Sequence, residues 1–363
     1  MNDRLRKLKR KFKNNKIDSF LVTKPHNVRW LTGYTGSNGI ALAGKRNSYF
    51  FTDFRYTEQA KKEVKNSGFK LVIAERDLYS ELGKLKSTVF GERIGFESDD
   101  LTVKFLDLVK KQVKKKKYIP MSGLILELRE VKDKSEVNLI KKAVKITDET
   151  FWDVLKLVKP GVVEADLNAE IEYGFLKRGG STAFDAIVAS GWRGALPHGR
   201  ASAKKIKKGE FITFDMGAVY SGYASDMTRT VMLGKPTDKQ KKIYDIVLRA
   251  QMAAIKAVKH GVKAKDVDKV ARDIITEEGY GPNFGHSLGH GIGIIRTGDR
   301  INIHEGPVLS PKSESVLKEG MVCTVEPGIY IPGWGGVRIE DDVVVTQNGC
   351  SILNKSPKGL MVL

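Results

Sequence analysis

Short apolar runs alternate with amphipathic stretches through the first third of the chain. A basic helix is expected first, because Leu5, Leu8 and Phe12 recur at helical spacing among lysines. Five runs then have the length and side chains of β-strands, at residues 19–22, 40–43, 49–52, 71–74 and 94–96. Helical spacing appears between them, at residues 57–67, 78–86 and 101–113. This alternation predicts a small α/β domain, which we place at residues 1–124.

The remaining sequence has a different pattern. Asp133 followed by Glu136 is typical of a capping box at the start of a helix. Helical spacing covers about residues 136–157 and 165–178, and strand-rich stretches follow at 186–190, 210–233 and 320–345. Two helical segments, 238–260 and 264–279, lie between the second and third stretches. We predict an α+β domain at residues 125–363, with helices on one face of an antiparallel sheet.

Carboxylates interrupt one of these strand-rich stretches. The segment FITFDMGAVYSGYASDMTRTVML, residues 211–233, holds Asp215 and Asp226 on either side of a turn that we place at YSG, residues 220–222. Folding there predicts that Asp215 lies directly opposite Asp226 on one face of a hairpin. Two opposed like charges destabilise a sheet unless something neutralises them, and a divalent metal ion is the expected neutraliser.

The last strand-rich stretch repeats this arrangement. VCTVEPGIYIPGWGGVRIEDDVVV, residues 322–345, folds about a glycine-rich loop at 333–336, which predicts Glu326 opposite Glu340. Arg338 stands two residues before Glu340 and is expected on the same face. Each carboxylate alone is typical of a solvent-facing strand position, but two mirrored pairs in apolar strands indicate a site for a hard cation.

Four of the six histidines fall in glycine-rich or turn-rich segments of the second domain. GHSLGHGIG contains His286 and His290, ALPHG contains His198, and NIHEGP contains His304. The glycines around His286 and His290 disfavour a helix, so we do not expect both to bind one metal as in a helical HExxH motif. We expect one of the pair to be a ligand and the other to contact substrate or the oxyanion. A nitrogen ligand shifts metal preference toward Mn²⁺, Co²⁺, Fe²⁺ or Zn²⁺.

These segments together resemble a known family. The order Asp, Asp, His, Glu, Glu within FDMG, SDMTRT, GHGIG, VEPGIY and GGVRIEDD is similar to that of the creatinase-fold, or pita-bread, metallopeptidases, which include Xaa-Pro aminopeptidase, prolidase and methionine aminopeptidase. FLVTKPHNVRWLTGYTGSNG, residues 20–39, resembles the start of the small non-catalytic domain of the first two enzymes. The resemblance implies a catalytic domain in which helices cover a curved antiparallel sheet.

The resemblance also implies metal ligands. Asp215 resembles a carboxylate that chelates one metal, and Asp226 and Glu340 resemble carboxylates that bridge two metals. His290 matches the histidine ligand, and Glu326 matches a ligand that also shuttles protons. Two divalent metal ions are therefore expected, with Mn²⁺ first and Co²⁺, Fe²⁺ or Zn²⁺ as alternatives.

Other residues match the part of the family site that meets substrate. His198 and His304 match histidines that contact substrate and stabilise the tetrahedral intermediate. His286 matches an auxiliary histidine, and Arg338 matches an arginine that supports the metal ligands. The implied reaction is metal-dependent hydrolysis of the bond between an N-terminal residue and a following proline, in peptides with proline at the second position.

Two departures from the family pattern affect the choice of substrate. The stretch GIGIIRTGDRINI between His290 and His304 is about twice the family length, with a turn expected at 297–299, and it carries Arg296 and Arg300, which would be able to reach a substrate carboxylate. Val308 stands where prolidases often carry an arginine that reads this carboxylate. We therefore expect an Xaa-Pro aminopeptidase, with an Xaa-Pro dipeptidase (prolidase) as the alternative.

Charge suggests an alternative of another class. The chain has 363 residues and a formal net charge of +20, which would suit a catalytically inactive pita-bread protein that binds protein or nucleic acid. The densest basic run, at 110–117, lacks the interleaved aromatic residues needed to stack single-stranded bases, and we interpret it as a solvated helix face. Because all five ligand positions are filled, nucleic acid is not an expected partner.

The cellular location and the oligomeric state are predicted from apolar runs, cysteine content and the family resemblance. No apolar run is long enough to span a bilayer, and no signal peptide is evident. The two cysteines, Cys323 and Cys350, exclude a disulfide framework. We expect a cytoplasmic protein without a membrane partner, and the family resemblance implies a homodimer.

Overall fold

The computed structural model describes residues 2–295 and 303–363. The chain divides into two compact units, Met1–Arg129 and Glu130–Leu363, each described here by itself. Within the described residues, no helix combines the length and the apolar composition that crossing a membrane requires.

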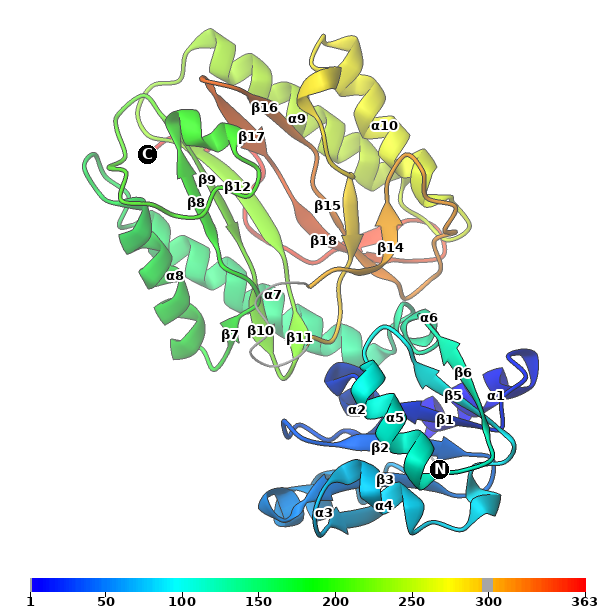
Figure 1. Cartoon of the computed structure of the whole chain (residues 1–363). Coiled ribbons are helices and arrows are strands. Elements are labelled where there is room, and N and C mark those ends of the chain that lie inside the picture. The colour runs from blue at the N-terminus through cyan, green and yellow to red at the C-terminus, as the bar shows by residue number, and fades with distance from the viewer. Residues whose placement is uncertain (1, 296–302) are drawn as a thin grey trace. The chain divides into compact units, whose positions relative to one another are not determined.

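The first unit is built on a six-stranded mixed sheet with the order β4-β3-β2-β1-β5-β6 (Figure 1). Its strands are β1 (Ser19–Val22), β2 (Ile40–Gly44), β3 (Ser48–Asp53), β4 (Lys70–Ala74), β5 (Arg93–Glu97) and β6 (Lys117–Met121). The pairs β1–β2 and β2–β3 are antiparallel, and the other three pairs are parallel. Its helices are α1 (Asp3–Asn14), α2 (Pro25–Thr32), α3 (Thr57–Glu63), α4 (Leu78–Gly83), α5 (Val103–Gln112) and α6 (Leu126–Arg129), with short 3₁₀ turns at Phe54–Tyr56 and Ser87–Val89.

The predicted elements of this unit are confirmed, but α2, β6 and the four-residue α6 were not predicted. All five predicted strands form, and the leading basic helix buries Leu5, Leu8 and Phe12. Helix α2 was not predicted, although Pro25 at its start and Gly33 after its end are typical helix boundaries. Strand β6 was also missed, because it pairs only with β5 at the edge of the sheet and contains Pro120.

The second unit has four long helices and a set of antiparallel strands. The helices are α7 (Lys134–Leu155), α8 (Glu164–Lys177), α9 (Asp238–Ala257) and α10 (Ala264–Glu277), with 3₁₀ turns at Gly191–Ala195 and Gly281–Asn283. The predicted capping box is confirmed, because Asp133 caps the backbone of Glu136 and Glu136 bonds back to Asp133. The predicted helices agree with α7–α10 to within three residues at each end.

The strands of the second unit form four small sheets. The strands are β7 (Ser181–Thr182), β8 (Ile187–Ser190), β9 (Phe211–Met216), β10 (Ala218–Tyr220), β11 (Tyr223–Ala224), β12 (Met227–Met232), β13 (Gly289–Gly291), β14 (Glu305–Leu309), β15 (Val322–Val325), β16 (Gly328–Ile331), β17 (Gly335–Arg338), β18 (Asp341–Val345) and β19 (Cys350–Ile352). Their orders are β11-β10-β7, β12-β9-β8, β14-β13-β15-β18-β19 and β16-β17, and every pair is antiparallel. Arg338 N donates to Thr230 Oγ1 and Glu340 N donates to Thr228 O, so β12 is joined to the β17–β18 segment. The predicted α+β class with an antiparallel sheet is confirmed.

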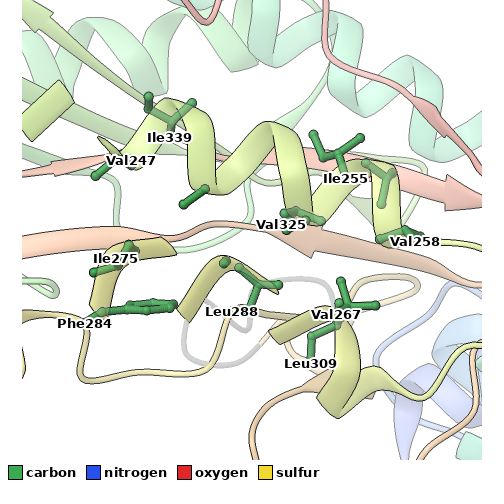
Figure 2. Packing of buried hydrophobic residues seen from close by; sticks show 14 of the residues in the cluster. Val247, Ile255, Val258, Val267, Ile275, Phe284, Leu288, Leu309, Val325 and Ile339 are labelled. Carbon is green, nitrogen blue, oxygen red and sulfur yellow. The ribbon is translucent and has the colours of Figure 1, made fainter. Parts of the chain in front are cut away.

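Helices cover these strands on the side of the apolar core. Helices α7 and α8 pack against β10, β11, β7 and β8, and α9 packs against β15, β16 and β17. Figure 2 shows Val247 and Ile255 of α9 near Val325 of β15 and near Ile339, which lies between β17 and β18. Each such side chain stabilises the fold by about 1.5–3 kcal/mol when fully buried.

This core determines where the polar residues of the strands point. Val325 and Ile339 are fully buried in the cluster, and the next residues along the chain are Glu326 and Glu340. Because successive side chains of an extended strand point to opposite faces, both carboxylates lie on the face away from α9. In β9, Ile212, Phe214 and Met216 enter a second apolar cluster, so Asp215 also points away from the helices.

Candidate active site

All nine side chains selected from the sequence line one cavity of about 490 Å³ in the second unit. They are Asp215, Asp226, His290, Glu326, Glu340, His198, His286, His304 and Arg338.

The register predicted for the first acidic hairpin is wrong by two residues. Ser221 and Gly222 both have positive φ, 47° and 82°, and form a two-residue turn that pairs Tyr220 with Tyr223. A two-residue turn with positive φ at both positions, as in type I′, matches the twist of a hairpin and fixes its register. Asp215 consequently lies opposite Thr228 and not opposite Asp226, which occupies the break between β11 and β12.

The register predicted for the second acidic hairpin is confirmed. Val325 pairs with Asp341 and Gly328 pairs with Arg338, and these pairs bracket Glu326 and Glu340. The two glutamates therefore face each other across the break between the strand segments.

A cluster of ligand-type atoms forms where these segments meet. Asp226, His290 and Glu340 each offer one atom within 4.8 Å of the other two. His290 Nε2 lies 3.5 Å from both Asp226 Oδ2 and Glu326 Oε1. Asp226 Oδ1 is buried without a hydrogen-bond partner among the described residues, which is unfavourable for a carboxylate oxygen. A cation bound among these atoms would satisfy that oxygen, so the residues fit a metal.

The electrostatics of the cluster lead to the same conclusion. Burial, reinforced by Asp226 and Glu326, raises the pKa of Glu340 well above its usual range. Burial raises the pKa of Glu326 to about 7, although His290 opposes the shift. It also raises the pKa of Asp215 to about 6 in spite of Arg338. Buried carboxylates this close disfavour one another's charged forms, and a bound divalent cation would reverse that preference.

His290 is held so that one ring nitrogen faces the carboxylates. Its Nδ1 donates to Gly291 O at 3.0 Å, which leaves Nε2 toward Asp226 and Glu326. Burial lowers the pKa of His290, but Asp226 and Glu326 overcome this effect and raise it to about 9. The flanking glycine is required because a Cβ at Gly289 would collide with Thr324 O. This orientation is the one expected for a histidine that binds metal through Nε2.

Residues of β12 and β17 form a hydrogen-bond network that orients the carboxylates. Arg338 Nη2 bonds Asp215 Oδ2 at 2.5 Å, and Arg338 Nε donates to Thr228 Oγ1 at 3.0 Å. Thr228 Oγ1 in turn donates to Glu340 Oε2 at 2.6 Å. Asp226 N donates to Asp342 Oδ2 at 2.9 Å. The predicted position of Arg338 beside the carboxylates is therefore present in the structure.

His286 belongs to a second chain of hydrogen bonds that also begins at Arg338. Arg338 Nη1 donates to the Tyr330 hydroxyl at 2.8 Å, and this hydroxyl lies 2.9 Å from His286 Nε2. Since His286 Nδ1 donates to Ser287 O, Nε2 accepts from Tyr330. Burial lowers the pKa of His286 to about 4, with Arg338 contributing. His286 therefore remains a neutral hydrogen-bond acceptor.

The long stretch before His304 leaves that histidine at the site. The rings of His304 and His290 stack with centroids 3.7 Å apart. Burial lowers the pKa of His304 to about 4, and His290 contributes to the shift. The expected turn at 297–299, with Arg296 and Arg300, lies outside the described residues. His198 lies on the opposite loop, after Gly191–Ala195, and is exposed toward the cavity.

Some cavity residues were not predicted from the sequence. Tyr330 had a usable signal, because strand alternation places it on the face of Arg338. Other lining residues lie on loops or at strand ends without such a signal, namely Phe184, Asp185, Pro197 and Arg200.

Comparisons with known proteins agree with this geometry. Residues 138–347 match metallopeptidase family M24, and residues 4–131 match the creatinase/prolidase N-terminal domain. The Xaa-Pro dipeptidase of Pyrococcus furiosus is 40% identical over 366 residues, covering 99% of this chain and 100% of that protein.

Solved structures show the same similarity. The Xaa-Pro dipeptidase from Bacillus anthracis is 44% identical, with a TM-score of 0.94 and 99% of each chain covered. An X-Pro aminopeptidase from Thermotoga maritima is 38% identical, with a TM-score of 0.89, covering 98% of this chain and 100% of that one. The chain therefore belongs to metallopeptidase family M24, with a creatinase/prolidase N-terminal domain ahead of its catalytic domain, and is a hydrolytic enzyme of the pita-bread fold.

Proposed function

We propose that this enzyme is an Xaa-Pro dipeptidase (prolidase), which releases proline from dipeptides. The observation that carries the proposal is the full-length similarity to the Xaa-Pro dipeptidases of P. furiosus and B. anthracis, at 40% and 44% identity. The expectation of an aminopeptidase, drawn from Val308, is less well supported than its alternative. It remains the second candidate because the T. maritima relative is named an X-Pro aminopeptidase.

Five residues are proposed to hold two divalent metal ions. Asp226 and Glu340 would bridge the ions, and Asp215, His290 and Glu326 would complete the set. The mixture of carboxylate oxygens with one imidazole suits Mn²⁺, with Co²⁺, Fe²⁺ or Zn²⁺ as alternatives. Bound there, the ions would lower the pKa of a water molecule and stabilise negative charge that develops on the substrate.

The other steps are assigned to side chains of this chain. Glu326 would accept the proton of the attacking water and deliver it to the proline nitrogen, as a general base and then a general acid. His198 and His304 would donate hydrogen bonds to the carbonyl oxygen as it gains negative charge, which stabilises the transition state more than the bound substrate. Arg338 and His286 keep Asp215 and Tyr330 in place.

A pair of peptides tests the proposal. The Mn²⁺-loaded enzyme is assayed with Ala-Pro and with Ala-Pro-Ala, and release of alanine is measured. We expect efficient cleavage of Ala-Pro and slow cleavage of Ala-Pro-Ala. Efficient cleavage of the tripeptide alone would establish the aminopeptidase. Cleavage of neither peptide, in protein that binds no Mn²⁺, would support the inactive binding protein.

Assembly and location remain proposals by resemblance. We propose a homodimer in the cytoplasm, since the family resemblance implies the first and the two cysteines agree with a reducing compartment. Light scattering after size-exclusion chromatography tests the homodimer, and a mass near 40.4 kDa, that of one chain, would contradict it.

A further inference from the structure

We propose that Arg200 binds the free carboxylate of the dipeptide substrate. The inference rests on the proposed dipeptidase function and names the residue that would enforce it. A dipeptide ends in a carboxylate one residue beyond the scissile bond, a distance of about 3.3–3.6 Å along the chain. The wall of the cavity must therefore neutralise a negative charge close to the carboxylate cluster.

Few cations on the described part of the cavity wall are available for this task. The arginines that line it are Arg200 and Arg338. Arg338 is only 4% exposed, and its Nε, Nη1 and Nη2 are engaged by Thr228, Tyr330 and Asp215. Moving it toward a substrate would leave the buried Asp215 carboxylate without its counter-ion, which is strongly unfavourable.

The histidines of the cavity do not supply the charge either. Both ring nitrogens of His286 are engaged, Nδ1 by Ser287 O and Nε2 by the Tyr330 hydroxyl. The ring of His304 is stacked on that of His290. His290 is turned toward Asp226 and Glu326. His198 is assigned to the scissile carbonyl, where it acts as a hydrogen-bond donor.

Arg200 combines an anchored backbone with an exposed side chain. Arg193 Nη2 donates to Arg200 O, and Arg193 Nε bonds Glu164 Oε2 at 3.0 Å. Glu164 is fully buried and also accepts from Ser202 Oγ at 2.7 Å, so the chain is tied down on both sides of Arg200. The Arg200 side chain itself is 80% exposed. The loop is thus fixed while the guanidinium remains accessible.

The guanidinium has room for a second carboxylate. Its Nη2 lies 3.0 Å from Asp185 Oδ2, and Asp185 is also on the cavity wall and 41% exposed. Exposed ion pairs of this kind contribute only about 0–1 kcal/mol, so Asp185 orients Arg200 without saturating it. The planar fork of five N–H donors can bind a substrate carboxylate in a bidentate manner as well. Val308, on the same wall, contributes no charge.

Substrates that differ only in the terminal charge test the proposal. Ala-Pro and its amide, Ala-Pro-NH₂, are compared in Mn²⁺-loaded wild type, Arg200→Ala, Arg200→Lys and Arg249→Ala. Arg249 is a matched control, because it is an exposed arginine in ion pairs with Asp245 and Glu278 and does not line the cavity.

We expect Arg200→Ala to raise KM for Ala-Pro by about 10- to 100-fold, as for loss of a charge-assisted hydrogen-bond pair. KM for the amide should change by less than about 3-fold, because the amide lacks the carboxylate that Arg200 would bind. The kcat for both substrates should also change by less than about 3-fold, because a contact that is equally strong in the ground and transition states affects KM and not kcat. Arg200→Lys should recover part of the loss, because a point charge replaces the fork. Arg249→Ala should behave as wild type.

The outcomes separate this inference from the function on which it rests. If wild type prefers Ala-Pro over the amide and Arg200→Ala keeps the same preference with an unchanged Tm, Arg200 is not the carboxylate site although the dipeptidase stands. If wild type cleaves Ala-Pro-Ala but not Ala-Pro, both proposals fail, since no dipeptide carboxylate is then bound.

Discussion

The two halves of the cavity are built from different parts of the second unit. The carboxylate half, defined by Asp215, Asp226, His290, Glu326 and Glu340, comes from strands and from breaks between paired strands. The loop half, defined by His198, Arg200, His304 and Val308, comes from the loop after Gly191–Ala195 and from the chain around β14. The carboxylate half is buried or half-buried behind an apolar core, whereas His198, Arg200 and Val308 are exposed.

This difference indicates that the two halves have different roles. In the carboxylate half several orienting contacts come from side chains that are themselves buried, namely Thr228, Arg338 and Thr324. Such a site holds ligands in one geometry, as metal binding requires. In the loop half, His304 stacks on His290, and Arg200 forms an exposed ion pair with Asp185 that leaves other guanidinium donors of Arg200 available to a substrate. We therefore expect changes in the first half to affect metal binding and changes in the second half to affect substrate binding or turnover without loss of metal.

The largest effect is expected from the proposed bridging ligands. Asp226→Ala or Glu340→Ala should reduce Ala-Pro hydrolysis to background and lower the Mn²⁺ content, because each carboxylate is proposed to bind both ions. Peptidase assays and elemental analysis of dialysed protein measure the two effects. Asp273→Ala, an exposed carboxylate change on α10, is the control. Near-full turnover in either variant would refute the bridging assignment.

A buried arginine beneath the carboxylate half should affect stability most. Arg229 is fully buried, donates to Glu340 O through Nη1 and pairs with the buried Asp341 at 2.8 Å. Arg229→Met leaves Asp341 with Lys358 as its remaining cation, so we expect a loss of about 3–5 kcal/mol in the free energy of unfolding. Urea denaturation measures it. A loss below about 1 kcal/mol would mean that the carboxylate half does not depend on this support.

A histidine of the loop half should separate turnover from metal binding. His304→Ala removes a proposed hydrogen-bond donor to the developing oxyanion, so kcat should fall by about 10²–10³-fold. The Mn²⁺ content should stay at the wild-type value, since His304 stacks on His290 but is not a proposed ligand. A variant that loses Mn²⁺ in parallel with activity would contradict the proposed division between the halves.

A smaller effect is expected from the hydroxyl that orients Glu340. Thr228→Val keeps the shape of the side chain but removes the bond from Thr228 Oγ1 to Glu340 Oε2, so Mn²⁺ affinity should fall by about 10- to 100-fold. Titration calorimetry with Mn²⁺ measures it. Thr230→Val on the same strand is the matched control, because Thr230 bonds the backbone of Arg338 and not Glu340. Equal losses in both variants would attribute the effect to general loosening of β12.

The sequence predicted the carboxylate half better than the loop half, for a physical reason. Strand alternation and a glycine-rich loop were sufficient to place Glu326 opposite Glu340. The same reasoning failed for Asp215 and Asp226, because a two-residue turn at Ser221 and Gly222 fixes a different register. The family resemblance, rather than spacing, distinguished His290 from His286.

Loops carry no such periodicity. Arg200 lies in a turn-rich segment whose backbone is held by Arg193, which in turn bonds the buried Glu164. The spacing of residues in the sequence does not indicate these contacts. The aminopeptidase expectation rested on Val308, which carries no charge. A positive charge on the cavity wall is supplied by Arg200, which lies elsewhere in the chain. Substrate preference was therefore the part of the sequence interpretation that the comparisons shifted, toward the dipeptidase.

The central claim is that the carboxylate half is a two-metal centre that serves peptide hydrolysis. The most direct test equilibrates metal-free protein with Mn²⁺, removes unbound ions and measures bound manganese together with Ala-Pro hydrolysis. We predict two Mn²⁺ per chain and activity that appears only as the metal binds. Protein that hydrolyses Ala-Pro at full rate without a bound divalent metal, or that binds no Mn²⁺, Co²⁺, Fe²⁺ or Zn²⁺, would contradict the claim.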